Sequence, residues 1–420
     1  MVSKTTLPNG VRILTEEIPC FRSVAIGIWV AAGSRDEADE ISGASHFIEH
    51  LLFKGTSHRT AKQIAEALDA VGGQLNAFTT KEYTCYHARV LDEHFDLAAD
   101  ILVDMLFNSL FSPDDIERER NVIIEEIKMY EDTPDELVHD VFASAIWKGH
   151  ALGLRVIGSA EAVASLSRES ILDFYTNHYR HGQMIVAAAG NVNHNRTVDK
   201  LAPLFAQLNG AGFVRKLERP VARQEISCRQ KDTEQVHVCV GTQGLRLDDD
   251  QVYVLQVINT VLGGGLSSRL FQEIREQRGL VYSVYSYHAS YHDTGLFAIY
   301  AGLSKENVNL VLDLITSELG KIRTEGIREE ELRRAKDQLK GNFLLSLESV
   351  NARMSRLGKS EMYLGKVIPP EEVVQRIEDV TPEQVRSLAD AMFRADRLAM
   401  ATVGSWCDVT AWRQAISRLE

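Results

Sequence analysis

The segment AEAVASLSRESILDFYTNHYRHGQMIVAAAGNV, residues 160–192, reads as a helix start, a helix and a hydrophobic strand in that order. Residues 374–406 repeat this order in the second half of the chain. In both segments a Ser or Thr precedes the helix as an N-cap, and the strand ends near a glycine, Gly190 or Gly404. An internal repeat of this length predicts two domains of one fold.

A second pair of matching segments lies upstream of the first pair, at residues 65–90 and 271–302. In each segment a helix breaks at glycine and leads into strands in which apolar residues alternate. Residues 206–224 carry Gly, Pro and mixed charge without sustained periodicity, which is typical of a linker. We therefore expect an α+β fold of two homologous α/β-sandwich domains, at 1–212 and 222–420, each with a mostly antiparallel sheet and helices packed on one side.

Length and composition agree with two domains of an ordinary globular protein. A chain of 420 residues is too long for one core, and its contents of 45% hydrophobic and 25% charged residues are unexceptional. The net charge of −13 argues against nucleic acid as a partner and is compatible with a cationic one.

The cysteines and the amino terminus bear on the compartment. The five cysteines are odd in number, widely spaced and without a Cys-x-x-Cys pair, so we expect neither a disulfide framework nor an all-cysteine zinc site: Cys20, Cys85, Cys228, Cys239 and Cys407. The amino-terminal sequence MVSKTTLPNGVRILTEEIP resembles neither a secretory signal nor a transit peptide, and no later run is apolar enough to span a bilayer. We predict a reducing compartment, the cytoplasm of a prokaryote-like cell, with no membrane partner. The mitochondrial matrix, reached as a mature chain, is the alternative.

The sequence His46-Phe47-Ile48-Glu49-His50 places two histidines four residues apart, the spacing of a half-built zinc site on a helix. At about 100° per residue, His46, Glu49 and His50 share one face and the apolar residues share the other. The order His-x-x-Glu-His, with a possible base inside the motif, favours a metallopeptidase over an incidental polar face.

A third zinc ligand is expected from the helix that begins near Ser112 and Pro113. On that helix Glu119 and Glu126 lie at the edge of the buried stripe, about 60° and 80° from its centre, whereas Glu125 points away from it. Because a carboxylate at a buried edge is costly unless it is paired or bound to metal, Glu126 is the better ligand candidate. Glu119 could orient a ligating histidine.

The motif HFIEHLLFKGT at residues 46–56, followed by Glu126 in ERNVIIEEI, resembles the pitrilysin/insulinase (M16) family of zinc metallopeptidases. The similarity covers nearly the whole chain. It is greatest to the two-domain branch that includes the mitochondrial processing peptidase β-subunit. The resemblance implies one zinc ion per chain, bound by His46, His50 and Glu126. It further implies that Glu49 activates a water molecule and that Glu119 supports the site.

The same resemblance implies where a substrate binds. Asn76, Ala77 and Phe78 match the strand that pairs with an extended peptide, with Phe78 beside the residue just after the cut bond. Arg275 and Tyr282, seven apart, match a pair that holds a substrate carbonyl. Locally, an exposed helix arginine and a strand tyrosine explain that pair almost as well.

Glu136 and Asp140 match an acidic pair that receives an arginine near the cut bond, if their segment is helical. A solvated acidic helix face is the alternative reading of these two residues. The resemblance thus implies peptide substrates that are basic or unfolded.

Two classes of function remain open at this stage. The first is a zinc endopeptidase that cuts peptides or unfolded segments in a closed chamber, either as a processing enzyme or as a general oligopeptidase. The second is a non-catalytic subunit of a family complex, although such relatives usually lose part of the zinc motif. Because this chain carries both the zinc motif and the Arg275/Tyr282 pair, we expect a homodimer rather than a heterodimer with an unlike subunit.

Overall fold

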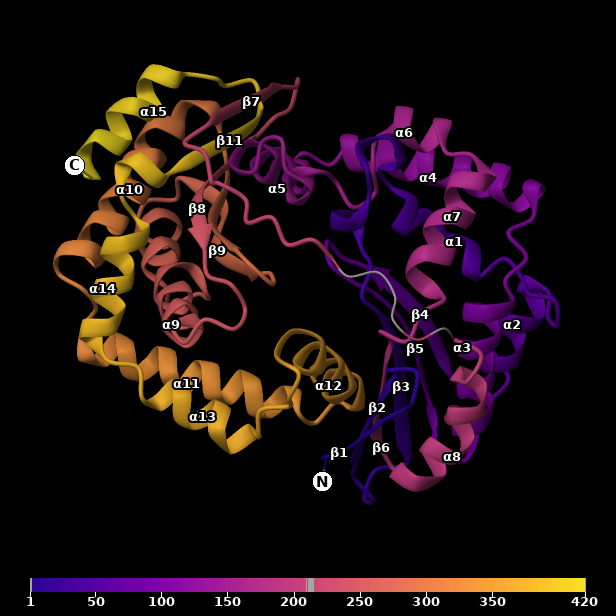
Figure 1. Cartoon of the computed structure of the whole chain (residues 1–420). Helices are drawn as coiled ribbons and strands as arrows, with labels where there is room; N and C mark the ends of the chain where they lie inside the picture. The colour runs from indigo at the N-terminus through magenta and orange to yellow at the C-terminus, as the bar shows by residue number, and fades with distance from the viewer. Residues whose placement is uncertain (1, 209, 211–214, 420) are drawn as a thin grey trace. The chain divides into compact units, whose positions relative to one another are not determined.

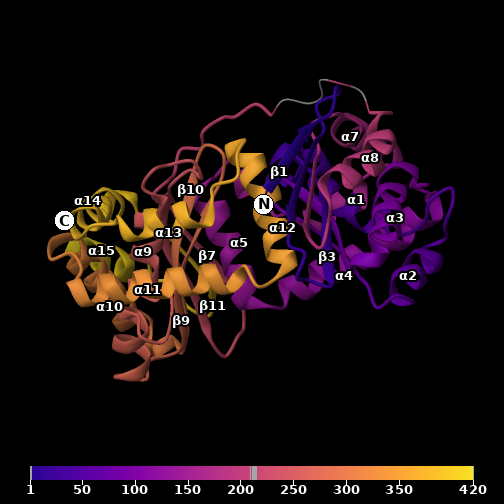
Figure 2. The ribbon, with the colours of Figure 1, turned by 90° about the horizontal axis from the view of Figure 1, so that it is seen from below.

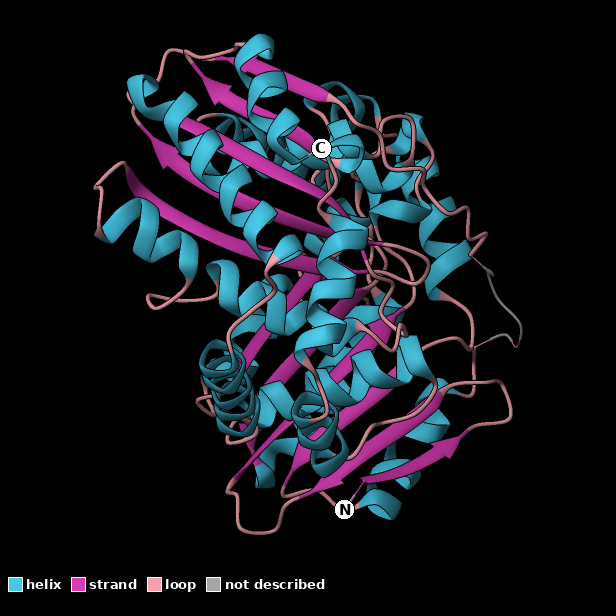
Figure 3. Ribbon diagram, turned by 90° about the vertical axis from the view of Figure 1, so that its left-hand side faces the viewer, coloured by secondary structure: helices cyan, strands magenta, loops and turns pink. Residues whose placement is uncertain are grey.

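The computed structural model describes residues 2–208, 210 and 215–419, which fold into two compact units. Each unit is assembled from three separate stretches of chain. Unit 1 comprises Met1–Lys128, Leu154–Lys216 and Leu345–Ile368, and unit 2 comprises Met129–Gly153, Leu217–Leu344 and Pro369–Glu420. In the secondary-structure view, each unit contains a sheet with helices packed against it (Figure 3).

Unit 1 is built on a six-stranded sheet in the order β1-β2-β6-β3-β5-β4. The β2–β6 pair is parallel and the other four pairs are antiparallel. The strands are β1 (Val2–Thr6), β2 (Arg12–Glu17), β3 (Ser23–Val30), β4 (Gln74–Thr79), β5 (Thr84–Leu91) and β6 (Ile185–Gly190). The strand β4 lies at one edge, so half of its backbone groups face away from the sheet.

Unit 2 is built on a five-stranded sheet in the order β7-β11-β8-β10-β9. Only the β7–β11 pair is parallel. The strands are β7 (Ile226–Gln230), β8 (Val236–Gly244), β9 (Val281–Ser290), β10 (Gly295–Leu303) and β11 (Ala399–Gly404). This order and these directions match β2-β6-β3-β5-β4 strand for strand, which confirms the internal repeat expected from the sequence.

Helices cover the broad face of each sheet. In unit 1 they are α1 (Ala44–Leu52), α2 (Ala61–Asp69), α3 (Phe95–Asn108), α4 (Pro113–Glu131), α6 (Ala160–Ser165), α7 (Arg168–Tyr179) and α8 (His194–Phe205). In unit 2 they are α9 (Val252–Gly263), α10 (Val308–Thr324), α11 (Glu329–Ser346), α13 (Pro370–Glu378), α14 (Pro382–Met392) and α15 (Val409–Ile416). The last three residues of α4 belong to unit 2, and the last two of α11 belong to unit 1.

The opposite face of each sheet is covered by a helix from the other half of the sequence. Helix α12 (Val350–Leu364) packs on β2, β3 and β6 of unit 1, and α5 (Pro134–Ile146) packs on β7, β8 and β11 of unit 2. Figure 1 shows the violet α5 beside the later-coloured strands of unit 2, and Figure 2 shows the orange α12 beside β3. The expectation that helices cover only one side of each sheet is therefore wrong.

The alternation of side chains on β3 explains how one strand serves both faces. Ile26 and Ile28 join the core beneath α1 and α3, whereas Trp29 joins Met354 and Leu357 of α12. Unit 2 repeats this arrangement, with Phe142 of α5 on the opposite face of its sheet from the main core.

The expected domain boundaries, 1–212 and 222–420, describe the repeat along the sequence and stay a prediction. The spatial units differ from these continuous segments because α5 belongs to unit 2 and α12 belongs to unit 1. Part of the expected linker, residues 209 and 211–214, lies outside the described residues. Its Arg215 lies in unit 1, where it donates two hydrogen bonds of 2.6 Å to the buried carboxylate of Asp36.

The sequence predicted no disulfide framework, but the structure pairs two of the five cysteines. Cys228 on β7 and Cys407, three residues beyond β11, form a disulfide across 179 residues of sequence. The reason lies in the sheet, because β7 and β11 are neighbouring strands that are remote in the chain. Cys20, Cys85 and Cys239 are free. Among the described residues, no helix is both long enough and apolar enough to cross a bilayer.

Candidate metal centre

Helix α1 carries the His-x-x-Glu-His motif and is held rigidly at its amino end. Its apolar face, which includes Phe47, Ile48 and Leu51, is buried in the core of unit 1. The N-cap residue Gly43 has φ of 97°, and a Cβ there would lie 2.8 Å from the carbonyl oxygen of Ile157, so only glycine fits. The buried carboxylate of Glu37 accepts hydrogen bonds of 2.7 Å from the backbone N–H groups of Gly43 and Ser45. These bonds satisfy donors that a helix start leaves unpaired.

The opposite face of α1 brings two metal-binding side chains together with one from α4. One donor atom each of His46, His50 and Glu126 lies within 4.8 Å of the others. Glu126 Oε2 is 3.9 Å from His46 Nε2 and 3.6 Å from His50 Nε2. Zinc bonds of about 2.0–2.2 Å in tetrahedral geometry require donor separations of about 3.3–3.6 Å. The 3.6 Å separation lies in this range and the 3.9 Å separation is slightly longer, so two imidazoles and a carboxylate could close on a zinc ion and leave one position open.

Glu119 fixes the tautomer of His50 that such an ion needs. His50 Nδ1 donates to Glu119 Oε2 at 3.1 Å, and Lys54 Nζ donates to Glu119 Oε1 at 2.8 Å. With the proton on Nδ1, the lone pair of His50 Nε2 faces Glu126 and is free for a metal. Glu119 thus contacts the ring that it is expected to support, and its role stays a prediction; the contact with Lys54 is an addition from the structure.

The protonation of His46 also suits a ligand. Burial, with a smaller contribution from the neighbouring His50, lowers the pKa of His46 to about 4. At neutral pH the imidazole is therefore uncharged and can donate its lone pair.

Glu49 lies beside the three donors and is held by the edge strand. Its Oε2 accepts a hydrogen bond of 2.6 Å from Thr79 Oγ1 at the end of β4. Burial raises the pKa of Glu49, opposed by the Thr79 hydrogen bond. A raised pKa strengthens the carboxylate as a base, which suits the proton transfer expected of this residue.

Asn76, Ala77 and Phe78 lie on β4, whose outer edge has no partner strand among the described residues. The Asn76 side chain accepts a hydrogen bond of 2.8 Å from the N–H of Ala77. Because the Thr80 N–H bonds inward to Tyr83, strand alternation turns the Ala77 N–H outward. The Asn76 amide oxygen therefore occupies the place that a peptide carbonyl would take. Phe78 packs edge-on against Trp29 and Tyr83.

The remaining predicted site residues lie in unit 2. Arg275 stacks over Phe271 at 4.8 Å within the π-helical turn η5 (Phe271–Glu276), and Tyr282 on β9 is 75% exposed. Both side chains are accessible to a ligand. Glu136 and Asp140 lie one turn apart on α5, which begins at Pro134 after the N-cap Thr133, as predicted.

The sequence did not predict the role of His139, which lies on α5 between Glu136 and Asp140 and contacts two tyrosines of β9. His139 Nδ1 lies 2.7 Å from the hydroxyl of Tyr287, and His139 Nε2 lies 3.1 Å from that of Tyr285. Burial lowers the pKa of His139 to about 4. The position of His139 between Glu136 and Asp140 was the signal in the sequence that it lies near the predicted site. Its two partners could not be predicted, because they are about 150 residues away in the sequence.

The fold has two repeated units, and the donor set is one that could hold a zinc ion. The chain belongs to peptidase family M16. Residues 12–160 match the family domain described as "Insulinase (Peptidase family M16)", and residues 165–339 match the "Peptidase M16 inactive domain".

Bacterial relatives share the whole length of the chain. An uncharacterized zinc protease of Bacillus subtilis, YmxG, is 44% identical over 94% of this chain and 97% of its own. An uncharacterized zinc protease of Streptomyces coelicolor is 45% identical over 98% of this chain and 91% of its own. These names indicate a zinc-dependent protease in general terms and leave the substrate open.

Solved structures confirm the fold. A peptidase M16 inactive domain from Pseudomonas fluorescens aligns with a TM-score of 0.90 at 21% identity, over 97% of this chain and 98% of the other. A protease from Helicobacter pylori gives a TM-score of 0.90 at 20% identity over 96% and 99%. A chain of complex III from Candida albicans gives 0.85 at 21% identity over 99% and 100%.

Proposed function

We propose that this protein is a zinc-dependent endopeptidase that cleaves peptides or unfolded, presequence-like segments inside a closed chamber. One observation carries the proposal: a base, Glu49, lies on the same helix face as two of three converging metal donors. A bound zinc ion would supply a Lewis acid and an acidified water at this place. Glu49 would accept the proton of that water and later deliver it to the leaving amine, while Thr79 keeps its carboxylate in position.

The edge strand β4 supports a peptide as substrate. An extended chain can pair with the outward backbone groups of β4 after displacing the Asn76 side chain from the Ala77 N–H. Pairing of this kind reads only the peptide backbone, which suits unfolded segments of varied sequence. We include Arg275 and Tyr282 as residues that hold a substrate carbonyl in the complete site.

We further propose that Glu136 and Asp140 favour arginine near the cut bond. Two carboxylates one helical turn apart can bind a guanidinium through several charge-assisted hydrogen bonds, whereas lysine offers only a point charge. The test is cleavage of a peptide library in which the residue two before the cut is Arg, Lys or Ala. Wild type should prefer Arg over Lys and strongly over Ala. The variant Glu136→Gln/Asp140→Asn should lose this preference for arginine. If the preference is unchanged in the variant, the two residues do not form part of the substrate site.

A non-catalytic role as a partner subunit is the second candidate. It is favoured by one comparison, the similar fold of a chain in a complex III assembly. Retention of the three donors together with Glu49 argues against it. The two zinc proteases of 44% and 45% identity come from bacteria, which favours our proposal of a bacterial cytoplasmic location over the mitochondrial matrix.

A further inference from the structure

Unit 1 contains a cavity of about 720 Å³ beside the edge strand β4, next to Phe53 and Lys54, which follow the carboxyl end of α1. Its apolar wall comes from Phe53, α2 and β4, and its polar wall comes from Lys54, Asp69, Gln74, Asn76, His87, Arg89 and Asn351. Its lining includes three small residues, Ala61 and Ala65 on the outer face of α2 and Gly73 before β4. A volume of this size accommodates several residues of a peptide.

The polar wall favours a negatively charged group. The cations are Lys54 and Arg89 and the anion is Asp69. Lys54 is already paired with Glu119 at 2.8 Å. The side chain of Arg89 is exposed and forms no ion pair or hydrogen bond with any residue that the structure describes. Its guanidinium is therefore the cation that remains available for a carboxylate.

The uncharged groups of the wall suit a peptide backbone beside that carboxylate. The Oδ1 atom of Asn351 is buried and has no hydrogen-bond partner within the described chain. A buried acceptor of this kind is costly unless a donor such as a peptide N–H reaches it. Burial also lowers the pKa of His87, so this imidazole is neutral at pH 7 and adds no charge.

The cavity continues the line of β4 away from the metal centre. Thr79, at one end of β4, contacts Glu49, and Gln74, at the other end, pairs with Arg89 in the neighbouring strand. Five residues of strand correspond to about 16 Å. A peptide that pairs with β4 would therefore bring a residue about four to six positions from the cut bond to Arg89.

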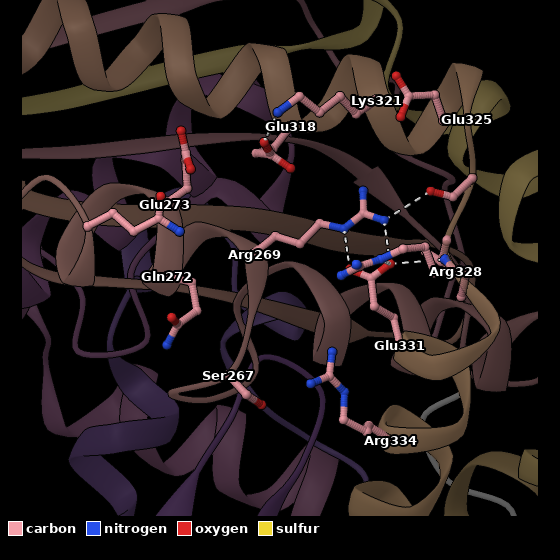
Figure 4. A pocket seen from close by; sticks show the side chains of 13 residues that line it. Ser267, Arg269, Gln272, Glu273, Glu318, Lys321, Glu325, Arg328, Glu331 and Arg334 are labelled. Carbon is pink, nitrogen blue, oxygen red and sulfur yellow. Dashed lines mark hydrogen bonds and ion pairs between the residues drawn. The ribbon is translucent and has the colours of Figure 1, made fainter.

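A second cavity, in unit 2, is lined by more charged residues than the first, but most of its basic residues are already paired with acidic ones. There Arg269 pairs with Glu331 through two contacts of 2.8 Å, and Lys321 pairs with Glu318 at 2.5 Å (Figure 4). Arg328 also pairs with Glu331, and the four basic residues of this lining are matched by four acidic ones, so the cavity as a whole does not favour a negatively charged ligand.

We propose that the cavity beside β4 is a distal substrate subsite that binds a carboxylate of an extended peptide through Arg89. The carboxylate is either a glutamate side chain or the free carboxyl terminus, about four to six residues from the cut bond. This inference rests on the proposed peptidase function, since it assigns a charge preference to the same substrate.

The test measures peptide binding separately from cleavage. Zinc-loaded Glu49→Gln protein is titrated with fluorescent dodecapeptides that carry glutamate at each position in turn, with glutamine analogues as references. We expect glutamate to lower Kd about two- to fivefold at one or two adjacent positions, the range of a partly exposed ion pair. Wild type should cut the same peptides four to six residues from those positions. Shortened peptides with a free or an amidated carboxyl terminus distinguish the two sources of the carboxylate.

Added to Glu49→Gln, the variant Arg89→Gln should abolish the glutamate preference, and Arg89→Lys should keep part of it. Arg22→Gln, the same change at an arginine of unit 1 outside the cavity, is the matched control and should keep all of it. Thermal unfolding checks that each variant is folded. Equal binding of glutamate and glutamine peptides, or a preference that survives Arg89→Gln, would overturn the proposal. Cleavage without a preference would count against the subsite alone, whereas an Arg89-dependent preference without cleavage by wild type would count against the peptidase function alone.

Discussion

At the scale of single residues, the contact between Glu119 and His50 is the clearest case of one side chain acting through another. Glu119 orients the imidazole and is itself held by Lys54. We predict that Glu119→Gln weakens zinc binding about 10–100-fold, because the ring loses the acceptor that fixes its tautomer. A chelator competition titration measures the change. Glu125→Gln is the matched control, since Glu125 lies on the same helix, is exposed and pairs with Lys128. An equal loss in both variants would show that the effect is general to α4.

The buried carboxylate of Glu37 predicts a pH dependence of stability. Burial raises its pKa from 4.5 to about 7, against the hydrogen bonds from Ser45 and Gly43. Because the folded pKa exceeds the unfolded one, the stabilisation is complete below pH 4.5 and is lost as the pH rises through about 7. Glu37→Gln cannot ionise and should escape that loss.

The measurement is the Tm of wild type and Glu37→Gln between pH 4.5 and 8, with EDTA present so that metal binding does not contribute. Relative to Glu37→Gln, wild type should become less stable as the pH rises. A difference in Tm that stays constant over this range would show that Glu37 does not titrate in the folded protein.

Helical geometry ranked the candidate ligands on each helix, and the family resemblance implied that they share one ion. The angles around α1 and α4 selected His46, His50 and Glu126 over Glu125, and the structure brings those three together. The supporting contacts could not be predicted in this way. Thr79, for example, comes from a strand 30 residues beyond Glu49 in the sequence, and no periodicity links the two.

At the scale of helices and strands, α5 and α12 each stabilise the sheet of the other half of the sequence. Leu357 and Phe142 are fully buried against unit 1 and unit 2 respectively. Replacing either by alanine should cost about 2–5 kcal/mol through loss of buried surface and formation of a cavity. Hydrogen exchange should locate the loss, in β3 and β6 for Leu357→Ala and in β8 and β11 for Phe142→Ala. If protection were lost instead in strands from the same half of the sequence as the mutated helix, the assignment of α5 and α12 to the sheet of the other half would be wrong.

The sequence repeat predicted the strand order but could not predict this exchange. An apolar stripe shows that a helix packs on something, and both sheets offer a similar apolar face. The choice of sheet depends on contacts remote in sequence, such as the ion pair of Arg353 on α12 with Glu16 on β2. The disulfide was missed for the same reason, because its two cysteines meet only through neighbouring strands.

At the scale of the whole molecule, the sequence carries the zinc motif and the Arg275/Tyr282 pair in one chain. We propose a homodimer in which each active site is completed by the partner's pair. Mixing Glu49→Gln subunits with Tyr282→Phe subunits tests this proposal. Each mixed dimer would contain one site with both changes and one with neither, so cleavage should reappear after mixing. If subunit exchange is verified by mass and no activity returns, completion across subunits is wrong.

The central claim is that His46, His50 and Glu126 hold a catalytic zinc ion for which Glu49 is the base. The most direct test measures zinc content and peptide cleavage on the same preparations of wild type, Glu49→Gln and Glu126→Gln. We predict one zinc per chain in wild type and in Glu49→Gln, with cleavage only in wild type, and loss of both in Glu126→Gln. Cleavage by Glu49→Gln at a rate close to that of wild type, or full zinc retention by Glu126→Gln, would contradict the claim.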